Sequence, residues 1–458
     1  MLNKRRFLTL SAALLLSLTA CGKGGNNQTA TVTFNPIEDN CMVNPKAKKY
    51  IDAMKEQEKK VEFPYRLSPL FGPEDYERMA AKADTNDGVK YSAEDTGGVD
   101  VCQYLSRNDY SNDCKNYPIT VSWDATPESF TNAKVAFWSK EDKSDLREVA
   151  VKSGATSAKL DNLYRATKYK YQLVNYDEAG ENQIGASNIG ELETGDYPRT
   201  ITMGDIHNVR DIGGFQSAYG GRLNQGLMYR GYYIDDKSGG HGKNYTKAAG
   251  QVQAEVMKIG CEIDLQKSSE TNGRKKSCLE GADYVNLMLI SYENFINNPE
   301  SYENLPAVME LMANSDQKHT YFHCWGGADR TGMLAFFILA ICGVSYTDCL
   351  IDFELTTQTN NKRCHMHNSS SAHFPKFLDA FVKFEGFDAN KSLNYNCQNV
   401  LLKRGVSMET IEKIRTIMIP GYKAGTPIPE QTEPLPVAAS IDANVKTVSC
   451  QYCEATQA

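Results

Sequence analysis

The chain has 458 residues, 41% of them hydrophobic, and carries a formal net charge of −7 at pH 7. This length leaves room for two or three domains, and the apolar fraction is ordinary for globular proteins. The sequence has no basic tract that could contact successive phosphates of a nucleic acid, so we expect no nucleic-acid partner.

The N-terminus combines a basic start with a short apolar segment. Lys4-Arg5-Arg6 is a basic start, Phe7 to Leu18 is an apolar segment too short for a stable membrane span, and Leu18-Thr19-Ala20-Cys21 follows. This arrangement resembles a lipoprotein signal peptide, in which residues 1–20 are removed and Cys21 is lipidated. The resemblance implies export to the bacterial cell envelope and a lipid anchor in a membrane, on the periplasmic or the outer surface. An uncleaved or fully released segment is the alternative.

Residues 21–114 give few structural signals. Gly22 to Ala30 is rich in Gly, Asn and Gln, which predicts a flexible tether. Lys49 to Lys60 is amphipathic and highly charged, which predicts a solvated helix.

Removing Lys4, Arg5 and Arg6 with the signal leaves 47 of the 50 basic residues against 57 acidic ones, so the mature chain should carry a net charge of about −10.

Residues 115–196 predict a small all-β sandwich. Short alternating runs are separated by turn residues, which is typical of antiparallel sheets packed face to face. The runs are Ile119–Trp123, Ala133–Trp138, Glu148–Val151, Tyr169–Val174 and Ile189–Thr194. Trp123 and the segment from Leu163 to Tyr169 resemble a fibronectin type III module, in which a leucine and a tyrosine fix a corner between two strands. Such a module would be a spacer or a binding module, or only a packing partner for the next domain.

A short segment, residues 323–331, carries most of the functional information. The β-formers before it, Thr320 to Phe322, predict a strand, and the apolar run Gly332 to Ala340 predicts a buried helix. The loop therefore leads into a helix N-terminus, where backbone N–H groups and the helix dipole favour an anion. The residues whose N–H groups are expected to surround a phosphoryl group are Trp325, Gly326, Gly327, Ala328, Asp329 and Arg330.

The side chains of this loop suit phosphate chemistry. Arg330 offers a planar charged fork that binds two phosphoryl oxygens at once. The same positive field favours the thiolate form of Cys324, which is then a nucleophile beside the bound phosphate. Thr331 can donate a hydrogen bond to the sulfur, whereas His323 is expected to hold the loop through its ring N–H. A buried structural cysteine is the plainer interpretation of Cys324, but it leaves the Gly, Asp, Arg and Thr unexplained.

These residues resemble the cysteine-dependent tyrosine phosphatases, and within them the bacterial group whose loop reads His-Cys-x-x-Gly-Lys-Asp-Arg-Thr-Gly. Further matching segments occur in the same order, and together they span residues 200–422. They are Asn208 to Gly214, Gly226 to Gly231, Ile263 to Gln266, Leu402 to Ser407 and Ile411 to Met418. The resemblance implies a three-layer α/β domain with a central, mostly parallel sheet. Two positions depart from the pattern, because the family lysine is Ala328 and a family arginine is Gln266.

The resemblance also suggests which residues assist the nucleophile. A positioned carboxyl must protonate the leaving group, and the candidates are Asp329 in the loop and Asp264 at a strand end. The plainer interpretation of Asp329 is a structural acceptor for loop N–H groups. Arg210 and Asp211 are expected to brace the loop from below rather than to react. They would otherwise form only a turn with a surface ion pair.

We therefore expect a phosphatase that uses no metal or other cofactor. Its substrate would be a phosphate monoester, with protein phosphotyrosine as the first candidate, because the absence of the lysine at Ala328 disfavours highly charged substrates. The alternatives are a phosphatase of inositol polyphosphates or small phosphate esters, and a non-catalytic surface lipoprotein that binds a phosphorylated ligand. The cluster Cys364, His365, His367 and His373 has no frame typical of a metal site and predicts a loop. Residues 425–458 predict a Pro-rich linker and tail.

Overall fold

The computed structural model describes residues 28–58, 116–235, 243–271, 273–358, 377 and 380–430. Within these ranges, no helix is long and apolar enough to cross a membrane. The expectations for Cys21, for the His365 cluster and for the tail after residue 430 lie outside the described residues.

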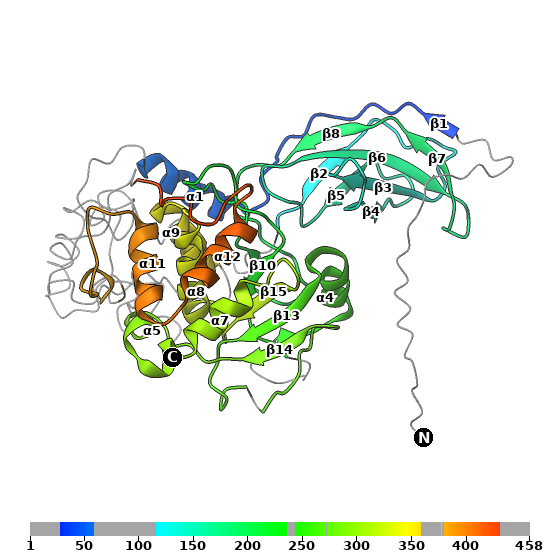
Figure 1. The fold of residues 1–458 in the computed structure, drawn as a ribbon. Helices are drawn as coiled ribbons and strands as arrows, with labels where there is room; N and C mark the ends of the chain where they lie inside the picture. Colours follow the sequence, from blue (N-terminus) through cyan, green and yellow to red (C-terminus); the bar gives the residue numbers. More distant parts are fainter. Residues whose placement is uncertain are drawn as a thin grey trace, which may run out of the picture. The chain divides into compact units, whose positions relative to one another are not determined.

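The chain divides into two compact units (Figure 1). The first, here called the β unit, comprises residues 1–35, 122–158 and 170–191. The second, here called the α/β unit, comprises residues 36–121, 159–169 and 192–458. Each unit is considered by itself below.

The β unit is built on a sheet in the order β1-β7-β6-β3-β4, with β8 also paired to β6. Its strands are β1 (Gln28–Ala30), β3 (Ala133–Trp138), β4 (Arg147–Ala150), β6 (Lys168–Tyr176), β7 (Gln183–Ser187) and β8 (Gly190–Glu193). A separate pair is formed by β2 (Ile119–Ser122) and β5 (Ser157–Leu160). The sequence pattern predicted β2, β3, β4, β6 and β8, but missed β5 and β7. Both are short and contain serine, and β7 also contains a glycine, so neither has the composition typical of strands.

Two contacts occur where the sequence resembles a fibronectin type III module. Leu163 is fully buried, and the hydroxyl of Tyr169, at the start of β6, accepts a hydrogen bond of 2.9 Å from the backbone N–H of Tyr164. Within the β unit, Trp123 is buried and its indole N–H donates to the hydroxyl of Thr126 at 2.8 Å. The Tyr169 hydroxyl thus ties the chain to the backbone at Tyr164, while the fibronectin type III module stays a prediction.

The α/β unit contains a central sheet of five strands in the order β14-β13-β15-β10-β9. The first four strands are parallel, and only β9 runs antiparallel, next to β10. The strands are β9 (Arg210–Asp211), β10 (Met228–Gly231), β13 (Ile259–Asp264), β14 (Asp283–Asn286) and β15 (His319–His323); β11 (Ile234–Asp235) and β12 (Lys243–Asn244) form a separate pair. The α/β character agrees with the expectation from the sequence.

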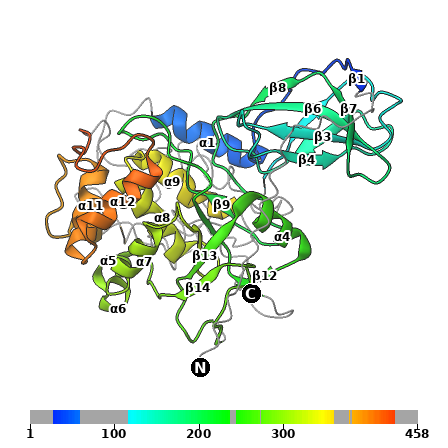
Figure 2. The same cartoon turned by 45° about the vertical axis from the view of Figure 1, so that its right-hand side comes forward.

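Helices cover both faces of this sheet (Figures 1 and 2). One face packs on α7, α8 and neighbouring helices through Met228, Ile263 and Phe322. The other packs on α4 and η2 through Tyr229 and Tyr321. The helices are α1 (Pro45–Glu58), α4 (Lys247–Val252), η2 (Gln253–Met257), α5 (Glu293–Asn297), α6 (Pro299–Tyr302), α7 (Leu305–Met312), α8 (Asp329–Ile341), α9 (Tyr346–Glu354), η3 (Leu355–Gln358), α11 (Leu393–Lys403) and α12 (Met408–Met418).

Helix α1 corrects one expectation. The segment from Lys49 to Lys60 was expected to be a solvated helix, but Tyr50, Ile51 and Met54 are almost fully buried in the core of the α/β unit. Figure 2 shows α1 beside α9, and Lys55 forms an ion pair of 2.8 Å with Asp348 of that helix. The expectation was wrong because three apolar side chains on one helical face are enough to dock a helix whose average composition is polar.

Candidate active site

The loop of residues 324–330, here called the Cys324 loop, joins the end of β15 to the start of α8. The strand and the helix lie where the sequence predicted them. Cys324 is buried, with 4% of its surface exposed, whereas residue Trp325 is 46% exposed. Helix α8 has 13 residues, so its N-terminal dipole is fully developed at the loop.

Gly327 allows the loop to turn sharply. Its φ is 63°, in the left-handed region that disfavours L side chains. A Cβ at this position would also lie 2.1 Å from the backbone oxygen of Gly231 at the end of β10. Only glycine therefore fits where the loop passes over the sheet.

Two buried side chains hold the loop carbonyl groups. The Asn208 amide donates to the carbonyl oxygens of Gly326 at 3.0 Å and Gly327 at 3.1 Å. Arg230 donates to the carbonyl oxygen of Gly327 at 2.7 Å. Because these carbonyl groups point to Asn208 and Arg230, the N–H groups of the same peptides can face the opposite side, as an anion site requires.

Asp352 of α9 anchors both arginines that support this arrangement. Its carboxylate accepts from Arg210 at 3.1 Å and from Arg230 at 2.5 Å, and all three side chains are almost completely buried. Burial lowers the pKa of Arg230 to about 10, although Asp352 opposes that shift. Burial alone would raise the pKa of Asp352, but Arg230 and Arg210 outweigh it and hold the pKa below its ordinary value. Asp352 and Arg230 are therefore both ionised at neutral pH.

Arg210 and Asp211, which the sequence grouped together, have different partners. Arg210 belongs to the cluster that holds the Cys324 loop. Asp211 instead accepts from Arg199 at 2.8 Å and from the backbone N–H groups of Gly213 and Gly226. They diverge because adjacent residues of a strand point to opposite faces of the sheet.

His323, the last residue of β15, lies in a second buried ionic cluster. Its Nε2 is 2.8 Å from Oε1 of Glu262, whose Oε2 accepts from Arg274 at 2.7 Å. Its Nδ1 is 3.2 Å from the carbonyl oxygen of Cys324 and 3.9 Å from Asp264. Burial alone would lower the pKa of His323, but Asp264 and Glu262 outweigh it and raise that pKa. The ring thus contacts the Cys324 loop, and its raised pKa favours the cationic form next to Cys324.

Arg330 forms a bidentate ion pair with Glu270, which follows β13. Nη1 donates to Oε2 at 2.6 Å and Nη2 donates to Oε1 at 3.0 Å. The hydrogen bonds from Arg330 are the main reason why the pKa of Glu270 lies below its ordinary value. A guanidinium has five N–H donors. One edge of Arg330 is therefore held by Glu270, and this ion pair uses two of the five N–H donors.

The two candidate acids differ in their surroundings. Asp329 is partly exposed at the first position of α8, and its Oδ1 accepts a hydrogen bond from the hydroxyl of Tyr292. Asp264 is fully buried, with one oxygen accepting from the backbone of Gln266 at 3.0 Å and the other from Tyr284 at 2.9 Å. Asp329 is better placed to reach a substrate because it is partly accessible to solvent.

Thr331 does not make the expected hydrogen bond to Cys324. Its hydroxyl oxygen is buried and has no hydrogen-bond partner among the described residues. Buried hydroxyl groups normally find a partner. The hydroxyl is therefore an unused donor one residue beyond Arg330.

Six residues to which the sequence assigned no individual role complete the site. They are Asn208, Arg230, Glu262, Glu270, Tyr292 and Asp352. Asn208 and Arg230 lie within segments that the resemblance had matched. Glu262 also had a sequence signal, because an ionisable residue in a strand of otherwise apolar character is expected to be paired. Glu270, Tyr292 and Asp352 lie in loops or on a helix and had no such signal.

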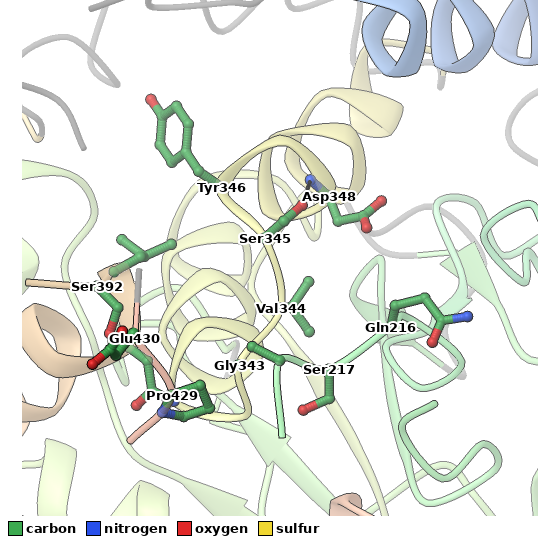
Figure 3. A pocket seen from close by; sticks show the side chains of 13 residues that line it. Gln216, Ser217, Gly343, Val344, Ser345, Tyr346, Asp348, Ser392, Pro429 and Glu430 are labelled. Atoms are coloured by element: carbon green, nitrogen blue, oxygen red, sulfur yellow. Dashed lines mark hydrogen bonds between the residues drawn. The ribbon is translucent and has the colours of Figure 1, made fainter. Parts of the chain in front are cut away.

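A separate cavity of about 270 Å³ lies at the opposite end of α8 (Figure 3). It is lined by Ser217, Gly343, Ser345, Asp348 and Ser392, among others. A helix of 13 residues is about 20 Å long, so this cavity is remote from the Cys324 loop. It contains none of the residues of the candidate site.

No metal site is found in the described ranges, where no three His, Cys, Asp or Glu side chains come together suitably. The cysteines in these ranges are free thiols: Cys41, Cys261, Cys278, Cys324, Cys342, Cys349 and Cys397. Burial raises the pKa of Cys41 and Cys261 to about 11, so neither thiol is activated.

Comparisons with solved structures concern the fibronectin type III resemblance. The chicken CNTN1 FN1-FN3 domains match with 24% identity, over 18% of this chain and 27% of theirs. The fn3 domain of human contactin 1 also matches with 24% identity, over 19% of this chain and 70% of its own. Both have a TM-score of 0.15, which is too low to show a shared fold. The fibronectin type III module therefore stays a prediction.

Comparisons of sequence concern the α/β unit. A Cupriavidus necator protein named "putative tyrosine-protein phosphatase" is 28% identical over 184 residues, which are 35% of this chain and 64% of the relative. The chain thus spans less than two thirds of that relative. Residues 201–418 match the model of the tyrosine phosphatase family. This segment includes the Cys324 loop and both buried clusters, and together the two matches support a phosphatase family for the α/β unit.

Proposed function

We propose that the protein is an exported, lipid-anchored phosphatase that hydrolyses phosphate monoesters, most readily protein phosphotyrosine, through a cysteinyl-phosphate intermediate. The arrangement of the Cys324 loop is the main observation that supports this chemistry. Its carbonyl groups are bound by Asn208 and Arg230, and Cys324 and Arg330 stand at its two ends. Such a loop offers N–H groups and one guanidinium edge to the equatorial oxygens of a phosphoryl group.

The reaction has two steps. The sulfur of Cys324 attacks phosphorus, the bond to the leaving oxygen breaks, and Asp329 gives that oxygen its proton. Water then attacks the phosphocysteine, Asp329 takes a proton from the water, and the sulfur leaves as a thiolate. Arg330 neutralises the phosphoryl oxygens in both steps.

Two features support an aryl phosphate as substrate. The exposed indole of Trp325 directly follows the nucleophile, and aromatic rings stack favourably on one another. Ala328 leaves the loop without the lysine that would favour a more highly charged ester. Phosphotyrosine combines an aromatic ring with a single phosphate.

The test is phosphate release by the purified chain, with reductant and EDTA present, from a phosphotyrosine peptide, a phosphoserine peptide, an inositol polyphosphate and an activated aryl phosphate. We expect phosphotyrosine to exceed phosphoserine and Cys324→Ser to abolish release. Preference for the inositol polyphosphate would favour the small-ester alternative. No release from any substrate by the folded protein would favour a binding lipoprotein.

The export and lipid anchor rest on the N-terminal sequence and need their own experiment. Expression in a bacterium with radiolabelled palmitate should label the chain, and Cys21→Ala should remove the label. Labelling that persists in the Cys21→Ala variant would contradict a lipid at this residue.

A further inference from the structure

We infer that Tyr292 is a positioning residue for Asp329, fixing the oxygen from which Asp329 exchanges its proton with the leaving group and with water. This inference rests on the proposed phosphatase function. Tyr292 lies in the α/β unit just before α5, remote in sequence from the Cys324 loop.

The first observation is the hydrogen bond itself. The Tyr292 hydroxyl donates to Oδ1 of Asp329, and the Tyr292 side chain is buried, with 5% of the residue exposed. The ring of Tyr292 lies edge-on to Phe353, with ring centroids 6.5 Å apart. An aromatic ring in an apolar core is ordinary, but a hydroxyl from another element that is aimed at a carboxylate of the active-site loop is a specific arrangement.

The second observation is the backbone of Tyr292. Its φ of 59° and ψ of −133° lie outside the regions that L residues prefer. Such a conformation is unfavourable for an L residue and persists only where surrounding contacts impose it. Here the ring packs in the core, and the Tyr292 carbonyl accepts from Phe295 at 2.9 Å. Strained residues of this kind gather at functional sites, which agrees with the position of the phenol.

The chemical consequence concerns the two oxygens of Asp329. Because Oδ1 accepts the hydrogen bond from Tyr292, the transferable proton is carried on Oδ2. In the first step this proton passes from Oδ2 to the leaving oxygen as the S–P bond forms and the P–O bond breaks. In the second step Oδ2 takes a proton from water as the new P–O bond forms and the S–P bond breaks. Tyr292 acts only through Asp329 and does not exchange a proton itself.

The experiment compares Tyr292→Phe with Tyr284→Phe in the full chain. Tyr284 is the matched control, because its hydroxyl donates to Asp264, the other candidate acid, at 2.9 Å. Each variant loses one hydroxyl and keeps the ring. The readouts are kcat and kcat/KM for phosphotyrosine, which has a poor leaving group, and for an activated aryl phosphate, together with thermal unfolding.

We expect Tyr292→Phe to lower kcat for phosphotyrosine about tenfold, equivalent to about 1.4 kcal/mol, and to lower kcat for the activated ester less than threefold. Tyr284→Phe should lower both equally or neither. In an Asp329→Asn background, Tyr292→Phe should add no further dependence on the leaving group, because the residue through which it acts is gone.

Several results would overturn the inference. Equal losses on both esters in Tyr292→Phe would mean a purely structural role, as would an unchanged effect in the Asp329→Asn background. Leaving-group dependence in Tyr284→Phe alone would transfer the role to Asp264. If neither ester releases phosphate in a Cys324-dependent way, the phosphatase proposal fails first and the role of Tyr292 fails with it.

Discussion

Asp352→Asn should destabilise the α/β unit strongly, because it leaves two buried arginines without their carboxylate. The Asp352 side chain is 2% exposed, and those of Arg210 and Arg230 are 0% exposed. Removing one partner of a buried ion pair costs about 3–5 kcal/mol. The substitution keeps the shape of the side chain, so the loss reports the charge and not a cavity.

The assay is urea unfolding followed by circular dichroism, since the helices of the described ranges all lie in the α/β unit. Asp283→Asn is the matched control. It breaks an ion pair with Lys318 on the same sheet, but both of those side chains are about 60% exposed, at 63% and 59%. An exposed pair contributes about 0–1 kcal/mol.

The effect should depend on pH in a defined direction. Arg230 and Arg210 hold the pKa of Asp352 below its ordinary value of about 3.9, against the opposing effect of burial. A carboxyl whose pKa is lowered by folding stabilises the protein above that ordinary value, and the stability is lost as the pH falls through the lowered pKa. The difference between wild type and Asp352→Asn should therefore be constant from about pH 5 to 7 and shrink below about pH 4.

Asp352→Asn should also weaken the site, because Arg230 binds both Asp352 and the carbonyl oxygen of Gly327. We expect KM for an aryl phosphate to rise while the control variant stays at the wild-type value. The reasoning is refuted if Asp352→Asn loses no more stability than Asp283→Asn between pH 5 and 7.

Three further predictions concern other parts of the α/β unit. Gly327→Ala should raise the inhibition constant of inorganic phosphate at least about tenfold, because the added Cβ would meet Gly231. Gly421→Ala is the control, since Gly421 has a similar φ of 74° but open space around it, and it should leave that constant unchanged. Glu262→Gln should lower the stability in urea most below about pH 6.5, where the His323 ring is charged and needs the carboxylate. The loss should decline as the pH rises through the raised pKa of His323. An equal loss at about pH 6 and about pH 9 would argue against a charged ring. Met54→Ala should cost about 2–5 kcal/mol in the same assay, and a loss under about 0.5 kcal/mol would mean that α1 is not docked.

The sequence by itself determined the local parts of this protein. The strand, loop and helix around Cys324 follow from β-formers, a glycine and an apolar run that are contiguous in the chain. The runs that became β2, β3, β4, β6 and β8 alternate with the period of a strand, so they too could be recognised locally. His323 could be placed beside the loop from the sequence because it is covalently next to it, and its ring contacts the Cys324 carbonyl group.

Only the tertiary structure decided which distant side chains meet at the site. Asp352 and Arg210 are separated by 142 residues, and Tyr292 and Asp329 by 37. Such pairs have no periodic signal, since the sheet order and the helix packing bring them together. Helix α1 shows the same limit, because its polar composition hid the three buried side chains that dock it. Patterns in a sequence record local geometry, whereas the partners of a buried charge are set by the whole fold.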